Sequence, residues 1–159
     1  MRKVLVAIDG SSSALRGVEY VGAQFSGLDD LHVTLFHVLP YVPAEFWEDG
    51  HILGKEEQEE RERVIDTWLS NQALKLEPIF RTAIKALAAR GISQQSITVK
   101  SVSDSVDTAG SILEEARTGG YMTVVMGRFG RSQTGRAATG STTHKVLHGG
   151  TGTAVCVVE

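Results

Sequence analysis

The chain contains little of what several classes of protein depend on. Its 159 residues include one cysteine, Cys156, which excludes an internal disulfide and a cysteine-rich metal site. No apolar run approaches the roughly 18 residues of a membrane span, and the five apolar residues between Lys3 and Asp9 are too few for a signal peptide. We therefore expect a cytoplasmic protein that makes no membrane contact.

A large excess of charge of either sign is also missing. The chain has 16 lysines and arginines against 19 aspartates and glutamates, for a net charge of −3. This balance provides no basic surface for nucleic acid or for an anionic membrane, so we expect neither as a partner. The hydrophobic content of 42% is enough for one core, and residues 1–159 are expected to form a single domain.

What the chain does contain is an alternation of strand and helix patterns. Five short apolar segments predict strands, namely Val4–Ile8, Leu31–Leu39, Ile97–Val102, Met122–Met126 and Ala154–Val158. The third of these alternates between apolar and polar residues, as an edge strand with one wetter face would. Because strands alternate with helices, the pattern implies a mostly parallel sheet with helices on both faces.

The helices between these strands have recognisable ends. A serine among residues 11–13 is expected to cap the first helix, Gly119-Gly120 to stop a later one, and the last to run from Gly140-Ser141 to Gly149-Gly150. The region Tyr41–Arg90 is less regular. Its charged run Lys55–Arg63 indicates a solvated helix face, and Pro78 fits the first turn of a further helix. This region therefore predicts two helices or one kinked helix.

The most specific pattern is a glycine-rich loop after an apolar strand. Val124–Gly130 reads as a buried strand that runs into the loop, and Gly140-Ser141-Thr142 reads as the start of a helix. Glycines let the backbone approach a ligand closely, while the N–H groups and dipole of a helix start attract negative charge. The pattern is typical of a phosphate site, and Arg128, Arg131 and Arg136 lie within its loop, where they either grip phosphates or face solvent.

A second polar position follows the first strand. In a doubly wound sheet, ligands bind beyond the carboxyl ends of the strands where the winding reverses. If the first and fourth strands are neighbours there, Asp9 and the glycine loop face one crevice. A carboxylate in that crevice can accept hydrogen bonds from ribose hydroxyls while the loop holds phosphates. The residues alone therefore point to a nucleotide.

Other candidate sites have plainer explanations. His37 is expected to pack beside the first strand, and Cys156 to be a small buried hydrophobe of a core strand. His144 and His148 have a metal-binding spacing but lack further ligands, so no metal site is predicted. Residues 130–137 have the glycine spacing of a P-loop without its lysine and hydroxyl, and no catalytic base, nucleophile and metal site can be assembled.

These residues resemble the universal stress protein family, in its nucleotide-binding branch. The resemblance covers nearly the whole chain. It is carried by the opening run Val4–Ser11, by Phe36-His37-Val38, by Val124–Gly127, and by a complete G-x2-G-x9-G-[ST] signature at Gly127, Gly130, Gly140 and Ser141. The chain departs from the family pattern at Met122, within Ser101–Val106, in the long segment Tyr41–Glu77, and in the absence of a proline before Val155.

The resemblance implies an α/β, Rossmann-like fold of the adenine nucleotide alpha hydrolase-like type, with a five-stranded parallel sheet in the order 3-2-1-4-5. It implies ATP or a related adenine nucleotide, with Mg²⁺ as a possible companion, and a homodimer formed through Ala154–Val158. In the family pattern Asp9 binds the ribose, and Ala7, Ile8 and Val38 wall the adenine. Met126 and Gly127 close the base and sugar side, Phe129 joins the binding set, and the phosphates lie against Gly130, Gly140, Ser141, Thr142 and Thr143.

Three functions are compatible with this pattern. We favour a binding module of the stress response, in which nucleotide occupancy sets a regulatory state. The alternative is an enzyme, either a slow ATPase or a phosphoryl or nucleotidyl transferase, that uses Ser141, Thr142 or an arginine of the loop. A structural dimer with an empty pocket is the third.

Overall fold

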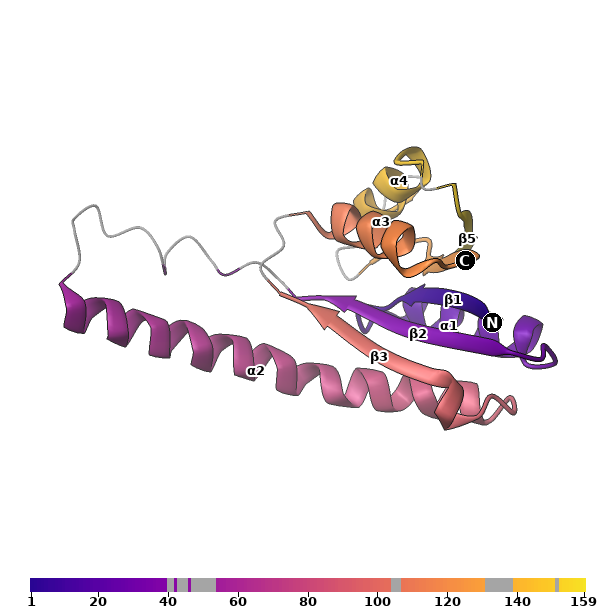
Figure 1. Cartoon of the computed structure of the whole chain (residues 1–159), viewed down its shortest axis with the longest axis horizontal. Coiled ribbons are helices and arrows are strands. Elements are labelled where there is room, and N and C mark those ends of the chain that lie inside the picture. The colour runs from indigo at the N-terminus through magenta and orange to yellow at the C-terminus, as the bar shows by residue number, and fades with distance from the viewer. Residues whose placement is uncertain (40–41, 43–45, 47–53, 104–106, 131–138, 151) are drawn as a thin grey trace.

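A five-stranded parallel sheet forms the centre of the computed structural model (Figure 1). The structure describes residues 1–39, 42, 46, 54–103, 107–130, 139–150 and 152–159. The strands lie in the order β3-β2-β1-β4-β5, and every neighbouring pair is parallel. The expected sheet and its order are therefore confirmed. The strands are β1 (Arg2–Ala7), β2 (Leu31–Val38), β3 (Ile97–Val102), β4 (Thr123–Gly127) and β5 (Ala154–Val158).

Two helices cover each face of the sheet, as predicted. Helices α1 (Ser12–Phe25) and α2 (Lys55–Ala88) pack on one face, and α3 (Thr108–Gly119) and α4 (Ser141–His148) pack on the other (Figure 1). A short 3-10 helix, η2 (Gln94–Ser96), precedes β3. Along β1 the apolar side chains alternate between the two faces, so the strand is buried on both sides.

Two predicted helix ends, each with a residue suited to capping, agree with the structure. The Ser11 side chain caps α1 by accepting a hydrogen bond from the Ala14 N–H at 3.1 Å. Helix α3 ends at Gly120, which has a left-handed backbone with φ of 67°. Strand β4 begins and ends one residue later than predicted, while β1 begins two residues earlier and ends one residue earlier.

In the part of Tyr41–Arg90 that the structure describes, a single α-helix is found, so of the two predicted alternatives the one with two helices is wrong and Pro78 opens no second helix. Pro78 lies inside α2, a single helix of 34 residues. Proline removes one backbone hydrogen bond from a helix interior. That loss is offset here because α2 continues past Pro78 to bury Ala83 and Leu87 against the sheet. The charged run Lys55–Arg63 occupies the exposed first turns of α2, as predicted.

Strand β3 lies at the sheet edge, and its apolar side is partly exposed. Val99 is 42% exposed, and Ile97 is half-buried. An open groove between α2 and β3, lined by Phe80, Ile84 and Val99, explains this exposure. The predicted edge position is confirmed, and the side of β3 that carries Ile97 and Val99 is itself only partly covered.

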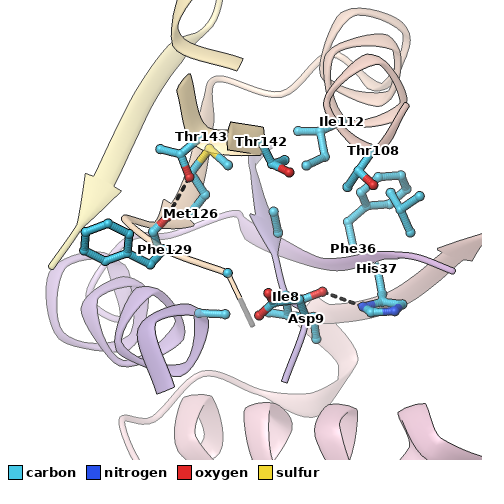
Figure 2. A pocket seen from close by; sticks show the side chains of 15 residues that line it. Ile8, Asp9, Phe36, His37, Thr108, Ile112, Met126, Phe129, Thr142 and Thr143 are labelled. Carbon is cyan, nitrogen blue, oxygen red and sulfur yellow. Dashed lines mark hydrogen bonds between the residues drawn. The ribbon is translucent and has the colours of Figure 1, made fainter. Parts of the chain in front are cut away.

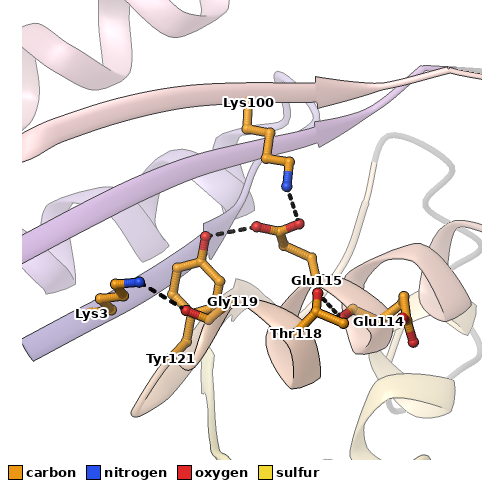
Figure 3. A network of polar contacts seen from close by, with 7 residues as sticks. All are labelled: Lys3, Lys100, Glu114, Glu115, Thr118, Gly119 and Tyr121. Carbon is orange, nitrogen blue, oxygen red and sulfur yellow. Dashed lines mark hydrogen bonds and ion pairs between the residues drawn. The ribbon is translucent and has the colours of Figure 1, made fainter.

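A polar network fixes α3 over the sheet (Figure 3). Glu115 of α3 is only 9% exposed and forms an ion pair with Lys100 of β3. Its carboxylate also accepts a hydrogen bond from the Tyr121 hydroxyl at 2.8 Å. Burial, reinforced by the Glu115 carboxylate and partly opposed by Thr34, raises the pKa of Tyr121. Lys3 of β1 donates to the Gly119 carbonyl at 3.1 Å, so the last two turns of α3 are tied to the sheet.

The end of β4 lies unusually close to the start of α1. A Cβ atom added to Gly127 would lie 2.5 Å from both the carbonyl carbon and the Oγ of Ser13. Real side chains do not approach a backbone this closely, so the position accepts no residue larger than glycine without movement of α1. Gly127 was predicted to contact a ligand, and the structure gives it this packing role in addition.

We expect Gly127→Ala to lower the free energy of unfolding by about 1–3 kcal/mol, because the added methyl group overpacks the contact with Ser13. Urea denaturation followed by circular dichroism measures the change. Gly27→Ala is the matched control, since nothing lies within 4 Å of a Cβ there, and its effect should stay within about 0.5 kcal/mol. A Gly127→Ala protein as stable as the parent would contradict the close approach.

Candidate functional site

The carboxyl ends of β1 and β4 lie side by side at the centre of the sheet. From β1 the chain winds outward through β2 to β3, and from β4 it winds the other way to β5. This is the reversal point at which open α/β sheets bind ligands. A cleft of about 510 Å³, part of it open to solvent, lies at this point (Figure 2).

Most of the residues predicted for the site line this cleft together. They are Ala7, Ile8, Asp9, Val38, Met126, Gly127, Phe129, Gly130, Thr142 and Thr143. Gly140 and Ser141 were also predicted but are not part of the lining. Arg131 and Arg136 lie outside the described residues.

One end of the cleft is mostly apolar. Its wall combines Ala7 and Val38 from strand ends with Phe36 of β2 and Ile112 of α3. Figure 2 shows Phe36, together with His37 and Thr108, on the side away from Phe129. Such a wall favours a flat, apolar ligand group with a polar edge.

His37 adds a buried polar group to this end. It is 4% exposed, and its Nδ1 lies 2.6 Å from the carbonyl oxygen of Ile8 (Figure 2). A carbonyl oxygen can only accept, so the proton of this hydrogen bond belongs to Nδ1. The expectation that His37 packs beside the first strand is confirmed, but the sequence did not identify it as part of the lining.

Asp9 lies in the middle of the cleft, directly after β1. Its Oδ1 accepts a hydrogen bond from the Ser11 N–H at 2.9 Å, which holds the carboxylate at the entrance to α1. Gly130 faces it, since a Cβ added there would lie 2.9 Å from Asp9 Oδ2. Asp9 and the glycine loop therefore share one crevice, as the sequence pattern predicted.

The opposite end of the cleft is formed by Phe129, Gly130 and the first turn of α4. Gly140 is the N-cap of α4, and its N–H donates to the Arg128 carbonyl at 2.8 Å. The N–H groups of the next residues, 141–143, have no acceptor within the helix, and the helix dipole adds positive potential there. This end of the cleft is suited to an anion.

Two residues near the start of α4, Thr143 and Gly140, support the fold of the loop. The Thr143 hydroxyl is buried and donates to the Gly127 carbonyl at 3.0 Å (Figure 2). Its proton is therefore in use, and Thr143 offers an anion only its backbone N–H. Gly140 supports the loop from behind, since a Cβ there would lie 3.4 Å from the Gly130 nitrogen.

Arg128 connects the glycine loop to β5. Its side chain forms an ion pair with Glu159, and its guanidinium lies 5.1 Å from the centre of the Phe129 ring. Its backbone N–H donates to the Val158 carbonyl at 2.8 Å. The sequence left open whether Arg128 grips phosphates or faces solvent. In the structure its side chain does neither fully, because it is partly covered and pairs with Glu159 next to the C-terminal strand.

Other lining residues were missed because they come from elements remote in sequence. Ala14 belongs to α1, and Thr108 and Ile112 belong to the first turns of α3. The apolar periodicity of α3 marks Ile112 as inward-facing, but no local signal says that this end of α3 reaches the cleft.

The structure adds no metal site to these features. His144 and His148 have ring centres 4.4 Å apart on α4, yet in the described ranges no group of three or more His, Cys, Asp or Glu side chains could hold a metal ion. Among the described residues, none of the helices combines the length and apolar character needed to cross a membrane.

Comparisons with known proteins agree with this architecture. The family model described as Universal stress protein family matches residues 1–157. No curated protein matches the chain. The chain is similar in structure to the universal stress protein UspA from Lactobacillus plantarum, with 16% identity, a TM-score of 0.68, and coverage of 99% of this chain and 97% of that one.

Two further similar structures are described as complexes with adenine nucleotides. A universal stress protein described in complex with cAMP has 21% identity, a TM-score of 0.66, and coverage of 99% and 97% of the two chains. An Arabidopsis thaliana universal stress protein family member described with AMP bound has 16% identity, a TM-score of 0.58, and coverage of 99% and 91%.

Proposed function

The chain belongs to the universal stress protein family, and from this premise we propose that it is a cytoplasmic, adenine-nucleotide-binding regulatory protein of the stress response. The observation that carries the proposal is the order of chemistry along the cleft. The cleft has an apolar end, a carboxylate in its middle and a helix start at its far end. In a nucleotide the base, the ribose and the phosphates follow one another in the matching order.

The apolar end would take the adenine. Ala7, Val38 and Met126 offer flat apolar contact from three strands, and Ile112 closes the wall from α3. Burial of an aromatic ring against such a wall provides most of the binding free energy for ligands of this size. The buried His37 beside it supplies a polar group near the edge of the ring.

The middle and the far end would take the ribose and the phosphates. Asp9 can accept hydrogen bonds from the ribose hydroxyls with a carboxylate that Ser11 already orients. Gly130 leaves the space beside that carboxylate open. Beyond it, the free N–H groups at the start of α4 and the Thr142 side chain face the phosphates. Mg²⁺ would enter with the triphosphate.

The two relatives described with AMP and cAMP support an adenine nucleotide as the ligand class. We propose ATP as the form that binds, with its phosphates held at Gly130 and at the start of α4.

Binding is favoured over phosphoryl transfer by the position of the titratable groups. In the described lining these groups are Asp9 and His37, and both lie toward the proposed ribose and base, with hydrogen bonds to Ser11 and Ile8. A catalytic base has to reach the nucleophile at the γ-phosphate. Of the two, Asp9 is the one that approaches the glycine loop, at Gly130, and its Oδ1 already accepts a hydrogen bond from the Ser11 N–H. Among the described residues, the lining at Thr142 and Thr143 carries no titratable group.

Calorimetric titration with ATP and Mg²⁺, on protein freed of co-purified nucleotide, should give micromolar binding. In Gly130→Val the added side chain fills the space beside Asp9, so we expect affinity to fall by roughly 100-fold or more. Gly140→Val should act in the same direction because it displaces Gly130 and Phe129.

The control for both variants is Gly27→Val, where a side chain meets open space and affinity should not change. Circular dichroism establishes that each variant is folded. If both loop variants bind ATP as the parent does, the cleft is not the nucleotide site.

A binding protein should leave ATP intact. We expect phosphate release at the spontaneous rate, with or without Mg²⁺, and no effect of Ser141→Ala, because Ser141 is outside the cleft lining. Release of phosphate that requires Mg²⁺ and falls in Ser141→Ala at unchanged ATP affinity would instead identify an enzyme. A malachite green assay distinguishes the two outcomes.

We also propose that the protein forms a homodimer through β5. This strand lies at the sheet edge, contains neither charge nor proline, and is largely half-buried. Ala154 and Val158 direct their backbone groups toward β4 and its flanking residues. The Ala154 N–H donates to the Met122 carbonyl, and the Val158 carbonyl accepts from the Arg128 N–H. Backbone groups alternate along a strand, so those of Val155 and Val157 point outward. Such an apolar, uncharged edge favours pairing with another strand.

Val157→Pro should prevent dimer formation without unfolding the subunit, because it removes an outward N–H and leaves the bonds to β4 in place. Sedimentation velocity should show a dimer for the parent and a monomer for Val157→Pro. Val157→Ala retains the N–H and should remain dimeric. A parent protein that sediments as a monomer at all concentrations would refute the dimer.

A further inference from the structure

Cys156 lies at the centre of β5, the strand that ends the sheet. The prediction that it is buried in a core strand is corrected by the structure, because β5 is an edge strand and Cys156 is half-buried. Its side chain packs on the α1 face together with Tyr20 and Phe25. The neighbouring Cys156 thiol, chiefly by hydrogen bonding, raises the pKa of Tyr20.

The directions of the backbone groups limit how two copies of β5 can pair. Antiparallel strands form hydrogen bonds only where outward-facing residues oppose each other. Val155 and Val157 are the outward-facing residues of each copy, so three registers are possible. Val155 of one copy opposes Val155 of the other in the first register and Val157 of the other in the second. In the third, Val157 opposes Val157. The second of these registers overlaps all five residues of both strands, whereas the other two overlap only three.

The fully overlapping register has a direct chemical consequence. Because Val155 opposes Val157 of the second copy, Cys156 opposes Cys156. The Cys156 backbone groups face β4, so this is a non-hydrogen-bonded pair, with Cα atoms about 4.5 Å apart. That separation is within the roughly 4.4–6.8 Å that a disulfide requires. Opposed residues also project from the same face of the sheet, which brings the two thiols together.

We propose that β5 pairs in this register and that Cys156 of two copies form an intermolecular disulfide when the protein is oxidised. The inference rests on the proposed homodimer and adds to it a defined register and a redox-dependent covalent link. Nothing about nucleotide binding is required for it.

The reaction needs a thiol-reactive oxidant, for which a small disulfide such as oxidised glutathione suffices. One Cys156 loses its proton and its thiolate attacks the small disulfide, which releases one small thiol and leaves a mixed disulfide. The second Cys156 thiolate then attacks the mixed disulfide and releases the other small thiol. Two electrons pass to the oxidant and one S–S bond joins the subunits. Reducing conditions reverse the reaction, as is typical of redox-sensing disulfides in the cytosol.

A covalent link changes what the edge contact can do. A dimer held by strand pairing dissociates when the protein is diluted, because its stability depends on protomer concentration. A cross-linked dimer does not. Oxidation would therefore preserve the dimer at concentrations where the reduced protein separates into subunits.

A series of single-cysteine proteins tests the register. The series comprises the parent, Cys156→Ala, and Val155→Cys or Val157→Cys each placed in the Cys156→Ala background. Each protein is incubated with oxidised glutathione at a concentration where the parent sediments as a dimer, and the cross-linked fraction is followed by non-reducing electrophoresis.

The parent should cross-link roughly tenfold faster than either displaced cysteine. In each of these two variants the introduced cysteine and its equivalent in the second copy would be diagonal neighbours. They would lie about 7–8 Å apart, beyond the range of a disulfide. Cys156→Ala should not cross-link. Val157→Pro, which keeps Cys156 but loses the strand pairing, should cross-link no faster than the displaced cysteines.

Each other outcome contradicts the proposal in a distinguishable way. Faster cross-linking by Val155→Cys or Val157→Cys would identify one of the shorter registers. A parent that sediments as a dimer but does not cross-link would refute the cysteine pair and leave the dimer standing. A parent that sediments as a monomer would refute both.

Discussion

The packing of α1 against the end of β4 is the contact on which the cleft depends. Gly127 lets Ser13 approach closely, and two further hydrogen bonds converge there. Ser13 Oγ accepts from the Phe129 N–H at 3.3 Å, and the Gly127 carbonyl accepts from the Thr143 hydroxyl at 3.0 Å. One residue without a side chain thus brings the first helix, the glycine loop and the last helix to a common point. The cleft lies between these elements, so its shape follows from this contact.

Side chains form one end of the cleft, and backbone groups form most of the other. Apolar side chains from three strands and α3 form one end, whereas glycines and a helix start form the other. Side chains suit recognition of a flat ring, and backbone N–H groups suit an anion that must be approached closely. Of the polar side chains near the helix start, that of Thr143 bonds to the Gly127 carbonyl. Among the described residues, the start of α4 therefore presents an anion with backbone N–H groups rather than with charged side chains.

The edge strand β5 is physically joined to the cleft. Arg128 leaves β4 at the start of the glycine loop, and its N–H, carbonyl and side chain contact Val158, Gly140 and Glu159 in turn. A single residue, Arg128, therefore connects Val158 of β5 to Gly140, the N-cap of α4, through backbone hydrogen bonds. Strand β5 has both a role inside the subunit, as the partner of β4, and an outer edge whose backbone groups are directed away from the fold.

Local chemistry in the sequence determined the strands, the Ser11 cap, the Gly120 stop and the glycine signature, because each depends on residues close together in the chain. The same reasoning left two helices or one kinked helix open around Pro78, and the structure has a single helix there because burial of Ala83 and Leu87 outweighs a local helix-breaking preference. Only the tertiary structure decided that Phe36, His37, Thr108 and Ile112 join the cleft, and that Cys156 lies at an edge. Those facts depend on which segments pack together. Packing is settled by the burial of surfaces distant in the chain, which no local pattern encodes.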